Sequence, residues 1–378
     1  MRFNHLYIHV PFCQSKCHYC DFTSYPLADA EQNLNGYGAL LEQELQLWQH
    51  KAELGPWRSI YWGGGTPSLL PLSALSDLMA LLKAQGLADN AEITLEANPE
   101  SLTAEALAAW QKAGINRLSI GVQSFDDELL AAMNRPHTAA EAYNTIKLAQ
   151  TAGFTNISLD LIYGLPEQNL AAWQADLEAA VVLAPQHISL YGLSLSKQSV
   201  WGRAEQAGSL IIADQDLSAD LLEEAIRFLP QAGFKQYEIA NFAKSGFESR
   251  HNTAYWQRDN YLGLGAAASS CAGLERWNNQ RDLGVYQACL KQGELPRFEL
   301  EQLSIEEVLG EALFLGLRQT KGLNLANYQE RYGISPLKYY RHALQRLQKQ
   351  GLVEVADGHL RLTERGLLLG NEVFEEFV

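Results

Sequence analysis

Three of the five cysteines in this chain lie within eight residues and could together bind a metal centre. Cys13, Cys17 and Cys20 follow the pattern C-x3-C-x2-C, whereas Cys271 and Cys289 are isolated. A structural zinc site normally draws four ligands from paired motifs on two loops. Three thiolates instead suit a [4Fe–4S] cluster whose fourth iron stays open for an exogenous ligand. An open iron implies chemistry at this loop.

Two other interpretations of the cysteine triple remain open at this point. His9 or His18 would complete a four-ligand zinc site. Alternatively, the three thiols would pack as small buried hydrophobes, although that role gives no reason for such spacing in a loop. The odd number of cysteines disfavours a disulfide framework.

Length and composition limit the class of protein. The 378 residues are 47% hydrophobic and 19% charged, which predicts a folded chain with one large domain and a smaller one. The net charge of -15 makes nucleic acid a poor partner, because phosphate binding depends on clustered cations. No apolar run is long enough to span a membrane, and the first residues lack the pattern of a signal peptide. We therefore expect a cytoplasmic protein without a transmembrane segment.

Short apolar runs alternate with helical patterns over the first half of the chain. The expected strands are 6–10, 59–62, 92–96, 117–122, 156–163 and 187–193. Segments such as 72–87 and 139–152 carry an apolar stripe at helical spacing. Six such units predict an α/β fold, a partial (βα)6 barrel, with its chemistry at the carboxyl ends of the strands.

The second half follows a different pattern. The alternation fails after about residue 205, and the Gly-rich, aromatic stretch 237–277 carries few helix signals. Ser304 and Glu307 form a capping box before a helix, a second helix is expected over 336–350, and Asp357-Gly358 marks a hairpin. These elements predict a C-terminal helical, winged-helix-like domain. The expected division is a core over 1–235, a connecting region over 236–298 and the C-terminal domain over 299–378.

Basic residues on and just before the second of these helices raise the question of a phosphate-binding face. They are Arg331, Lys338, Arg341, Arg346 and Lys349. From Glu301 to the end, however, 11 acids balance 9 bases. A solvated basic face is therefore the favoured interpretation.

Several polar residues fall at the expected mouth of the barrel. The run Gly63-Gly64-Gly65-Thr66-Pro67 follows the second strand and lets a ligand approach the backbone closely. Glu96 ends the third strand, Gln123 follows the fourth, and Arg135 lies beyond it. Asp160 lies on a strand that should be buried on both faces, so its carboxylate needs a partner.

The C-x3-C-x2-C motif after the first strand of a partial barrel resembles the radical S-adenosylmethionine (SAM) superfamily. The resemblance implies a [4Fe–4S] cluster on Cys13, Cys17 and Cys20, with SAM bound to the open iron and an external reductant for the cluster. It also implies SAM contacts at these positions: Tyr7, Gly64, Gly65, Thr66, Glu96, Gln123, Arg135 and Asp160.

Within that superfamily the chain is most similar to the coproporphyrinogen-dehydrogenase-like group. The segments that carry this similarity are Tyr-Ile-His-Val-Pro-Phe-Cys at 7–13, residues 62–67, 118–123 and 160–166, and His-Ile-Ser-Leu-Tyr at 187–191. One branch of the group oxidatively decarboxylates coproporphyrinogen III, and the other binds haem and delivers it to acceptor proteins. The decarboxylase pattern has a further cysteine where this chain has Phe22, and a longer segment than the 12 residues that precede Cys13 here.

A third feature separates the two branches. The segment His251-Asn252-Thr253-Ala254-Tyr255-Trp256 resembles the haem-binding H-N-x-x-Y-W signature of the chaperone branch. A neutral imidazole is a good axial ligand for haem iron, and aromatic rings can cover the macrocycle. The resemblance implies His251 as the ligand, with Tyr255 and Trp256 as walls, although the motif could instead shape the fold between domains.

The resemblance therefore implies a haem chaperone on a radical SAM scaffold. Its cofactors would be the [4Fe–4S] cluster, SAM and haem. Its partners would be acceptor apo-haemoproteins, with those of a respiratory complex as candidates. The alternative is an oxygen-independent coproporphyrinogen III oxidase. The sequence leaves open whether the scaffold acts as an enzyme.

Overall fold

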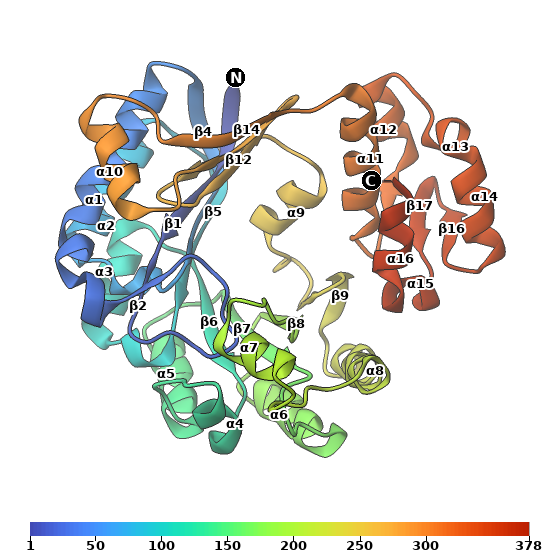
Figure 1. Cartoon of the computed structure of the whole chain (residues 1–378), viewed down its shortest axis with the longest axis horizontal. Helices are drawn as coiled ribbons and strands as arrows, with labels where there is room; N and C mark the ends of the chain where they lie inside the picture. Colours follow the sequence, from blue (N-terminus) through green and yellow to red (C-terminus); the bar gives the residue numbers. More distant parts are fainter. Residues whose placement is uncertain (378) are drawn as a thin grey trace.

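The structure, a computed structural model, describes residues 1–377 and is built on a curved parallel sheet with helices on its outer face (Figure 1). The strands that were expected are all present: β1 (Arg2–Val10), β4 (Glu53–Gly64), β5 (Leu87–Ala97), β6 (Arg117–Gln123), β7 (Ile157–Tyr163) and β8 (His187–Gly192). The outer helices are α1 (Leu27–Gln49), α2 (Leu72–Ala84), α3 (Ala104–Ala113), α5 (Ala139–Thr151), α6 (Leu170–Val182) and α8 (Gln215–Gln231). The prediction of a partial barrel is confirmed.

Parallel pairing brings the carboxyl ends of these strands to one rim. The six lie in the order β1-β4-β5-β6-β7-β8, and each pairs in parallel with its neighbour. Apolar stripes fix the helices on the sheet: α2 buries Leu75, Leu78, Met79 and Leu82. Residues that follow each strand are therefore gathered at one end of the barrel.

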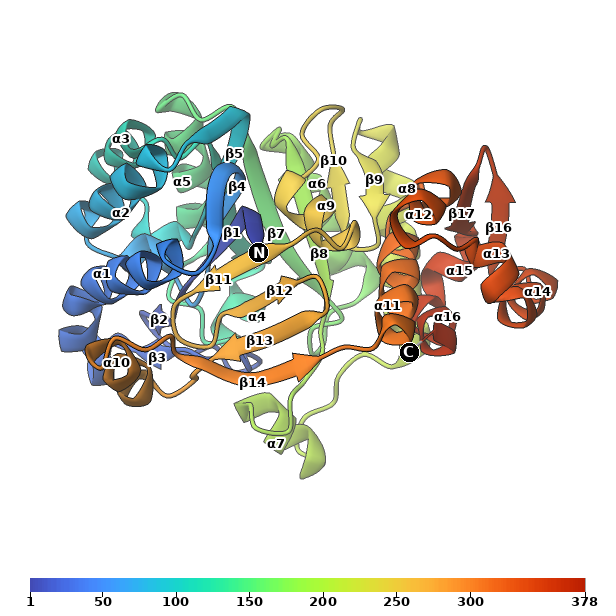
Figure 2. The ribbon, with the colours of Figure 1, turned by 90° about the horizontal axis from the view of Figure 1, so that it is seen from above.

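The stretch 237–277, which carries few helix signals, is more ordered than the sequence indicated. Within the described residues, one sheet holds twelve strands, because additional strands extend both edges of the parallel core. These are β9 (Lys235–Glu238) and β10 (Asn241–Ala243) beside β8, and β11 (Tyr261–Leu264), β12 (Ser269–Ala272), β13 (Glu275–Asn279) and β14 (Arg297–Gln302) beside β1 (Figure 2). Two helices, α9 (Arg250–Trp256) and α10 (Leu283–Lys291), lie between these added strands in the chain. Two short helices of the first part, α4 (Asp127–Ala132) and α7 (Val200–Gln206), lie at the rim.

The C-terminal part has a hydrophobic core of its own, which includes Leu313, Leu347 and Leu360. Its elements are α11 (Ile305–Leu317), β15 (Leu323–Asn324), α12 (Leu325–Tyr332), α13 (Pro336–Tyr339), α14 (Arg341–Lys349), β16 (Val353–Ala356), β17 (His359–Leu362), α15 (Glu364–Leu368) and α16 (Gly370–Phe374). The capping box of Ser304 and Glu307 and the hairpin at Asp357-Gly358 are confirmed. The prediction of a single helix over 336–350 is wrong. The backbone of Tyr340 leaves the helical region and separates α13 from α14.

Helix α9 connects the barrel to this C-terminal part, and its N-terminus is fixed by a buried carboxylate. Glu92 of β5 accepts hydrogen bonds from the Ser249 hydroxyl (3.4 Å) and from the backbone N–H groups of Arg250 and His251 (both 3.1 Å). An acidic side chain at this position satisfies free N–H groups and complements the helix dipole. The barrel strand therefore determines where α9 begins.

The other end of α9 is held by the C-terminal part. Arg258, just beyond the helix, pairs with Glu311 of α11 at 2.8 Å. Arg331 of α12 donates to the carbonyl oxygens of Gln257 and Arg258, both at 2.7 Å. Arg331 and Arg346, which pairs with Glu376, thus contact protein groups and not only solvent. No helix among residues 1–377 is long and apolar enough to cross a membrane.

Removal of the Glu92 carboxylate should loosen α9. We expect Glu92→Ala to lower the free energy of unfolding by about 3 kcal/mol, since three donors lose their acceptor in a buried setting. Urea denaturation measures this change. Glu248→Ala, which alters an exposed residue just before α9, should stay within about 0.5 kcal/mol of wild type. Equal stability of the two variants would contradict this role of Glu92.

Candidate metal centre and adjoining pocket

The cysteine loop begins where β1 ends and closes on itself. Strand β2 (Phe12–Cys13) pairs with β3 (Tyr25–Pro26), so the chain between them forms a closed loop at the rim of the barrel. Its outer part is bonded to the rim: the His18 backbone donates to the Met133 carbonyl (3.1 Å) and accepts from the Trp201 N–H (2.9 Å). All three cysteines in it are half-buried, with free thiols. Tertiary contacts therefore hold the thiols at the mouth of the barrel.

These thiols border a cavity of about 390 Å³. Seven of the residues expected to contact SAM also line it, and they come from four strands and the loops that follow: Gly64, Gly65, Thr66, Glu96, Gln123, Arg135 and Asp160. Tyr7, the eighth, lies just behind it, with its hydroxyl 3.0 Å from Nδ1 of His9. The sequence-predicted cluster and SAM positions thus come together around one cavity.

The glycine turn after β4 lies against the cysteine loop. A Cβ atom on Gly64 would lie 2.7 Å from the His9 ring, and the φ of Gly64 is +114°. A Cβ atom on Gly65 would lie 2.6 Å from the Phe12 carbonyl oxygen and 3.0 Å from Sγ of Cys13. Such contacts are too short for any side chain. Both positions therefore require glycine, because a side chain at either would clash with the residues around the cysteine loop.

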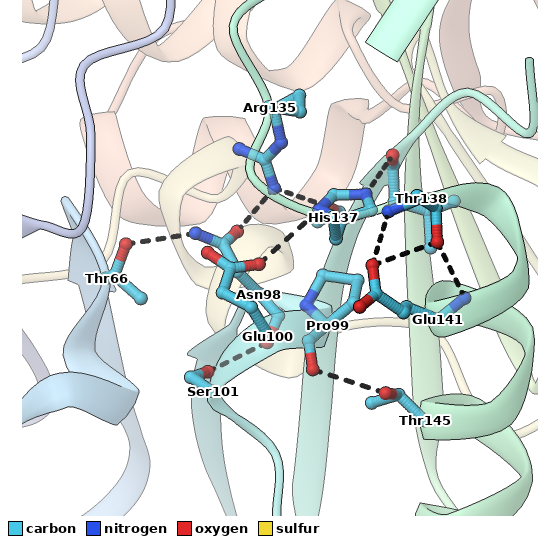
Figure 3. A network of polar contacts seen from close by, with 12 residues as sticks. Thr66, Asn98, Pro99, Glu100, Ser101, Arg135, His137, Thr138, Glu141 and Thr145 are labelled. Carbon is cyan, nitrogen blue, oxygen red and sulfur yellow. Dashed lines mark hydrogen bonds and ion pairs between the residues drawn. The ribbon is translucent and has the colours of Figure 1, made fainter. Parts of the chain in front are cut away.

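Arg135 and Asn98 link the cysteine loop to the glycine turn, and Figure 3 shows the part of this link that runs from Arg135 through Asn98 to Thr66. Nη1 of Arg135 donates to Sγ of Cys17 at 3.5 Å, and Nη2 donates to Oδ1 of Asn98 at 2.8 Å and to the Gly121 carbonyl at 2.7 Å. Nδ2 of Asn98 in turn donates to the Thr66 hydroxyl at 3.1 Å. One guanidinium thus connects a thiol, a strand carbonyl and the turn.

A second layer of polar groups supports this connection (Figure 3). His137 is buried; its Nε2 bonds the Val122 carbonyl at 3.2 Å, and its Nδ1 lies 3.4 Å from Glu100. Hydrogen bonding to His137 and the charge of Arg135 lower the pKa of Glu100, against the opposing effect of burial. The contacts of His137 therefore hold the loop that carries Arg135 in place.

Two carboxylates line the cavity from the strand side. Glu96 accepts from the Tyr61 hydroxyl (2.8 Å) and from the Gly64 N–H (3.1 Å), and burial raises its pKa to about 7. Asp160 accepts from the Ser119 hydroxyl at 3.1 Å to each oxygen. Burial raises the pKa of Asp160 as well. The Ser158 hydroxyl of the same strand donates to Oδ1 at 3.3 Å, so two serine hydroxyls are the partners that Asp160 needed.

Sequence reasoning missed Asn98, His137 and Tyr61. Asn98 directly follows β5, so its position at the rim was a usable signal. His137 and Tyr61 act through contacts that cross between strands and loops, and no local pattern marks them. The φ of Gln123 is +70°, an uncommon value for a residue other than glycine, at a register shift of β6. That backbone conformation could not be expected from the residue type.

The residues expected to bind haem lie on α9, and none of them lines this cavity. His251 is only 1% exposed, with Nδ1 bonded to the Ser59 hydroxyl and Nε2 to the Tyr255 hydroxyl, both at 2.8 Å. Burial lowers the pKa of His251 to about 3, so its ring is neutral. Trp256 is half-buried beneath the Arg318 guanidinium, 4.5 Å from its ring centre. The motif is thus packed between the barrel and the C-terminal part.

The donor set fits a thiolate-bound cluster better than zinc. The His9 ring is occupied by the Tyr7 hydroxyl and the Thr23 carbonyl, and Nδ1 of His18 bonds the Ala132 carbonyl. Within residues 1–377, no three His, Cys, Asp or Glu side chains lie close enough together to hold a single ion, and this includes the three cysteines. Three thiols around a cavity with room for a second ligand match a site-differentiated iron–sulfur cluster.

Comparison with known proteins agrees with this geometry. The model of the radical SAM superfamily matches residues 7–180, and that of the HemN C-terminal domain matches residues 303–369. The fold and the cysteine motif define a radical SAM protein, a class that implies a [4Fe–4S] cluster and SAM. The solved structure of coproporphyrinogen III oxidase (HemN) from Escherichia coli superposes with a TM-score of 0.82 at 25% identity, covering 98% of this chain and 89% of that one.

Curated relatives extend over the full length. The chain is 37% identical to haem chaperone HemW of Bacillus subtilis over 98% of both chains, and 33% identical to HemW of Haemophilus influenzae over 99% of this chain and 97% of that one. A mitochondrial radical S-adenosyl methionine domain-containing protein 1 from Bos taurus is 35% identical over 96% and 84%. The chain therefore belongs to the radical SAM superfamily and, within it, to the family of these relatives.

A methyl group on Gly65 should disrupt the metal centre. We expect Gly65→Ala to bind about half the iron of wild type or less after reconstitution, because relief of the contact with the Phe12 carbonyl must move the cysteine loop. Iron content per chain is the measurement. Gly36→Ala, with nothing within 4 Å of the added atom, should bind as much iron as wild type. Full iron content in Gly65→Ala would contradict this account of the turn.

Proposed function

We propose that this chain is a haem chaperone built on a radical SAM scaffold. The observation that carries the proposal is the joining of three free thiols and seven expected SAM positions around one cavity, in a chain related over its full length to curated haem chaperones. Cys13, Cys17 and Cys20 hold the [4Fe–4S] cluster. SAM occupies the cavity beside them. An external reductant serves the cluster, and the haem goes on to apo-haemoproteins, including respiratory ones.

The chain's own residues shape this SAM site. A reduced cluster with SAM at its open iron supplies one-electron chemistry when both are bound. Arg135 donates to Cys17, and a donor at that sulfur stabilises thiolate charge. Glu96 and Asp160 offer carboxylates to a ligand that carries a positive sulfonium, and Gly64 and Gly65 let it approach the backbone.

Haem is bound through His251 in this proposal, with Tyr255 and Trp256 against the macrocycle. The neutral state of the ring supports ligation, because iron takes a free imidazole nitrogen. Both ring nitrogens of His251 are hydrogen-bonded in this structure. Ligation therefore requires the ring to exchange the Ser59 or Tyr255 hydroxyl for iron. Haem loading therefore includes a movement of α9.

A second cavity supports access to α9 from outside the barrel. It has a volume of about 590 Å³ and is lined by Arg250, Thr253 and Ala254 of α9, together with Arg58. The carboxylates of Asp89, Glu248 and Asp259 line it as well, so its charges are mixed. This side of α9 is the one from which we infer that haem approaches.

The alternative function is oxygen-independent decarboxylation of coproporphyrinogen III. It is favoured by the overall likeness to the Escherichia coli coproporphyrinogen III oxidase. Phe22 argues against this function, because the decarboxylase pattern has a cysteine at that position. The Phe22 side chain lines the cavity and is 63% exposed, so it offers an apolar surface and no thiol to a ligand.

Truncation of the haem ligand tests the chaperone proposal. We expect His251→Ala to bind haem at least about tenfold more weakly than wild type in a spectroscopic titration, since the iron loses its axial nitrogen. His187→Ala is the matched control. His187 is equally buried and bonded to a serine and a tyrosine, Ser158 and Tyr237, but lies outside the motif. Unchanged haem affinity in His251→Ala, or an equal loss in His187→Ala, would contradict ligation by His251.

A further inference from the structure

A stack of rings crosses the interior of the barrel behind the SAM cavity. Tyr61 lies between Tyr7 and His251, with ring centres 6.2 Å and 5.1 Å away and interplanar angles of 26° and 27°. None of the three rings lines the cavity itself. The stack therefore connects α9 with the back of the SAM site.

On the cavity side, the stack ends at a carboxylate. The Tyr61 hydroxyl donates to Oε1 of Glu96 at 2.8 Å, while the Gly64 N–H holds the other oxygen at 3.1 Å. A Cβ atom on Gly63 would lie 2.9 Å from the Tyr7 ring, 3.0 Å from the Tyr61 ring and 3.2 Å from Oε1 of Glu96. The first glycine of the turn is thus the point around which these three side chains converge.

On the α9 side, the His251 ring has a fixed orientation. Hydrogen bonds to the Ser59 and Tyr255 hydroxyls occupy both ring nitrogens, and the backbone N–H of His251 donates to Glu92. The Tyr255 ring also meets the His251 ring edge to face, with ring centres 4.7 Å apart at 76°. A ring held by two hydrogen bonds and an edge-to-face contact restricts the tilt and position of the Tyr61 ring that lies against it.

We propose that Tyr61 and His251 are positioning residues for Glu96, so that the seating of α9 in the barrel determines how tightly the chain binds SAM. Neither residue touches the cavity, and both act through the orientation of the Glu96 carboxylate. This role goes beyond the proposed haem function and does not depend on haem binding. It assigns a task to the H-N-x-x-Y-W motif in the haem-free protein.

The charges around Glu96 give this role a pH signature. Burial and the charge of Asp160 raise the pKa of Glu96, while the hydrogen bonds from Tyr61 and Gly64 and the charge of Arg117 lower it, and the balance is a pKa of about 7. Tyr7, Tyr191 and Tyr255 also face this carboxylate, but their own pKa values are raised well above the ordinary range and they stay neutral. SAM is cationic at sulfur, so its affinity should increase as Glu96 ionises near pH 7.

The experiment is equilibrium binding of SAM to cluster-loaded Tyr61→Phe across pH. Loss of the hydroxyl that stabilises the carboxylate should raise the pKa of Glu96, weaken SAM binding about tenfold near pH 7 and bring affinity back toward wild type at higher pH. Tyr328→Phe, which removes a buried hydroxyl bonded to the Leu309 carbonyl in the C-terminal part, should bind SAM as wild type does. Unchanged affinity in Tyr61→Phe, or a loss that is equal at every pH, would overturn the proposal.

A second pair of variants tests His251 in the absence of haem. His251→Ala removes the ring beside Tyr61 and should weaken SAM binding severalfold, whereas His251→Phe keeps a ring there and should restore part of the loss. Both variants lack a haem ligand, so failure of the haem proposal appears only in the haem titration. Equal SAM affinity in His251→Ala and wild type would overturn the role of His251.

Discussion

The close approach of the glycine turn to the cysteine loop is the constraint on which the functional part of this structure depends. Gly65 leaves no room for a side chain between itself and the Phe12 carbonyl, and Gly64 packs against the His9 ring. Because β1 pairs in parallel with β4, this approach places the three cysteines and the glycine turn around one cavity. Arg135 and Asn98 then connect the loop and the turn across the rim.

Helix α9 is the second organising element, and its stability comes from outside itself. Seven residues are too few for a helix to persist alone in water. Glu92 fixes its beginning from β5, while Glu311 and Arg331 fix the residues after its end from the C-terminal part. Any movement of α9 that exposes His251 must therefore break contacts with both parts of the chain. In the proposed haem function, loading through His251 would therefore be coupled to the seating of the C-terminal part.

Much of the barrel and of its rim could be predicted, because the relevant signals are local. Apolar runs mark the six parallel strands, and residues that follow parallel strands necessarily meet at one edge. The cysteine spacing, the glycine run and Asp160 were readable for the same reason. The sequence could not indicate that Asn98 and His137 support Arg135, since these contacts arise only when separate loops come together.

The stretch around α9 was the least predictable part. Its helix is held by Glu92, which lies about 160 positions earlier, and its flanking strands pair at the edges of a sheet that the first half of the chain builds. The break between α13 and α14 at Tyr340 was likewise hidden, since the residues around it have ordinary helix propensity. In these places tertiary contacts, and not local preference, decide the structure.

In the proposed function this radical SAM scaffold carries haem and does not consume coproporphyrinogen III. The most direct test is anaerobic incubation of cluster-loaded, SAM-binding protein with reductant, SAM and coproporphyrinogen III, with the products quantified by chromatography. We expect no decarboxylated product, because Phe22 stands where the decarboxylase pattern has a cysteine. Formation of more than one protoporphyrinogen per chain would contradict this expectation and make the decarboxylase the primary function.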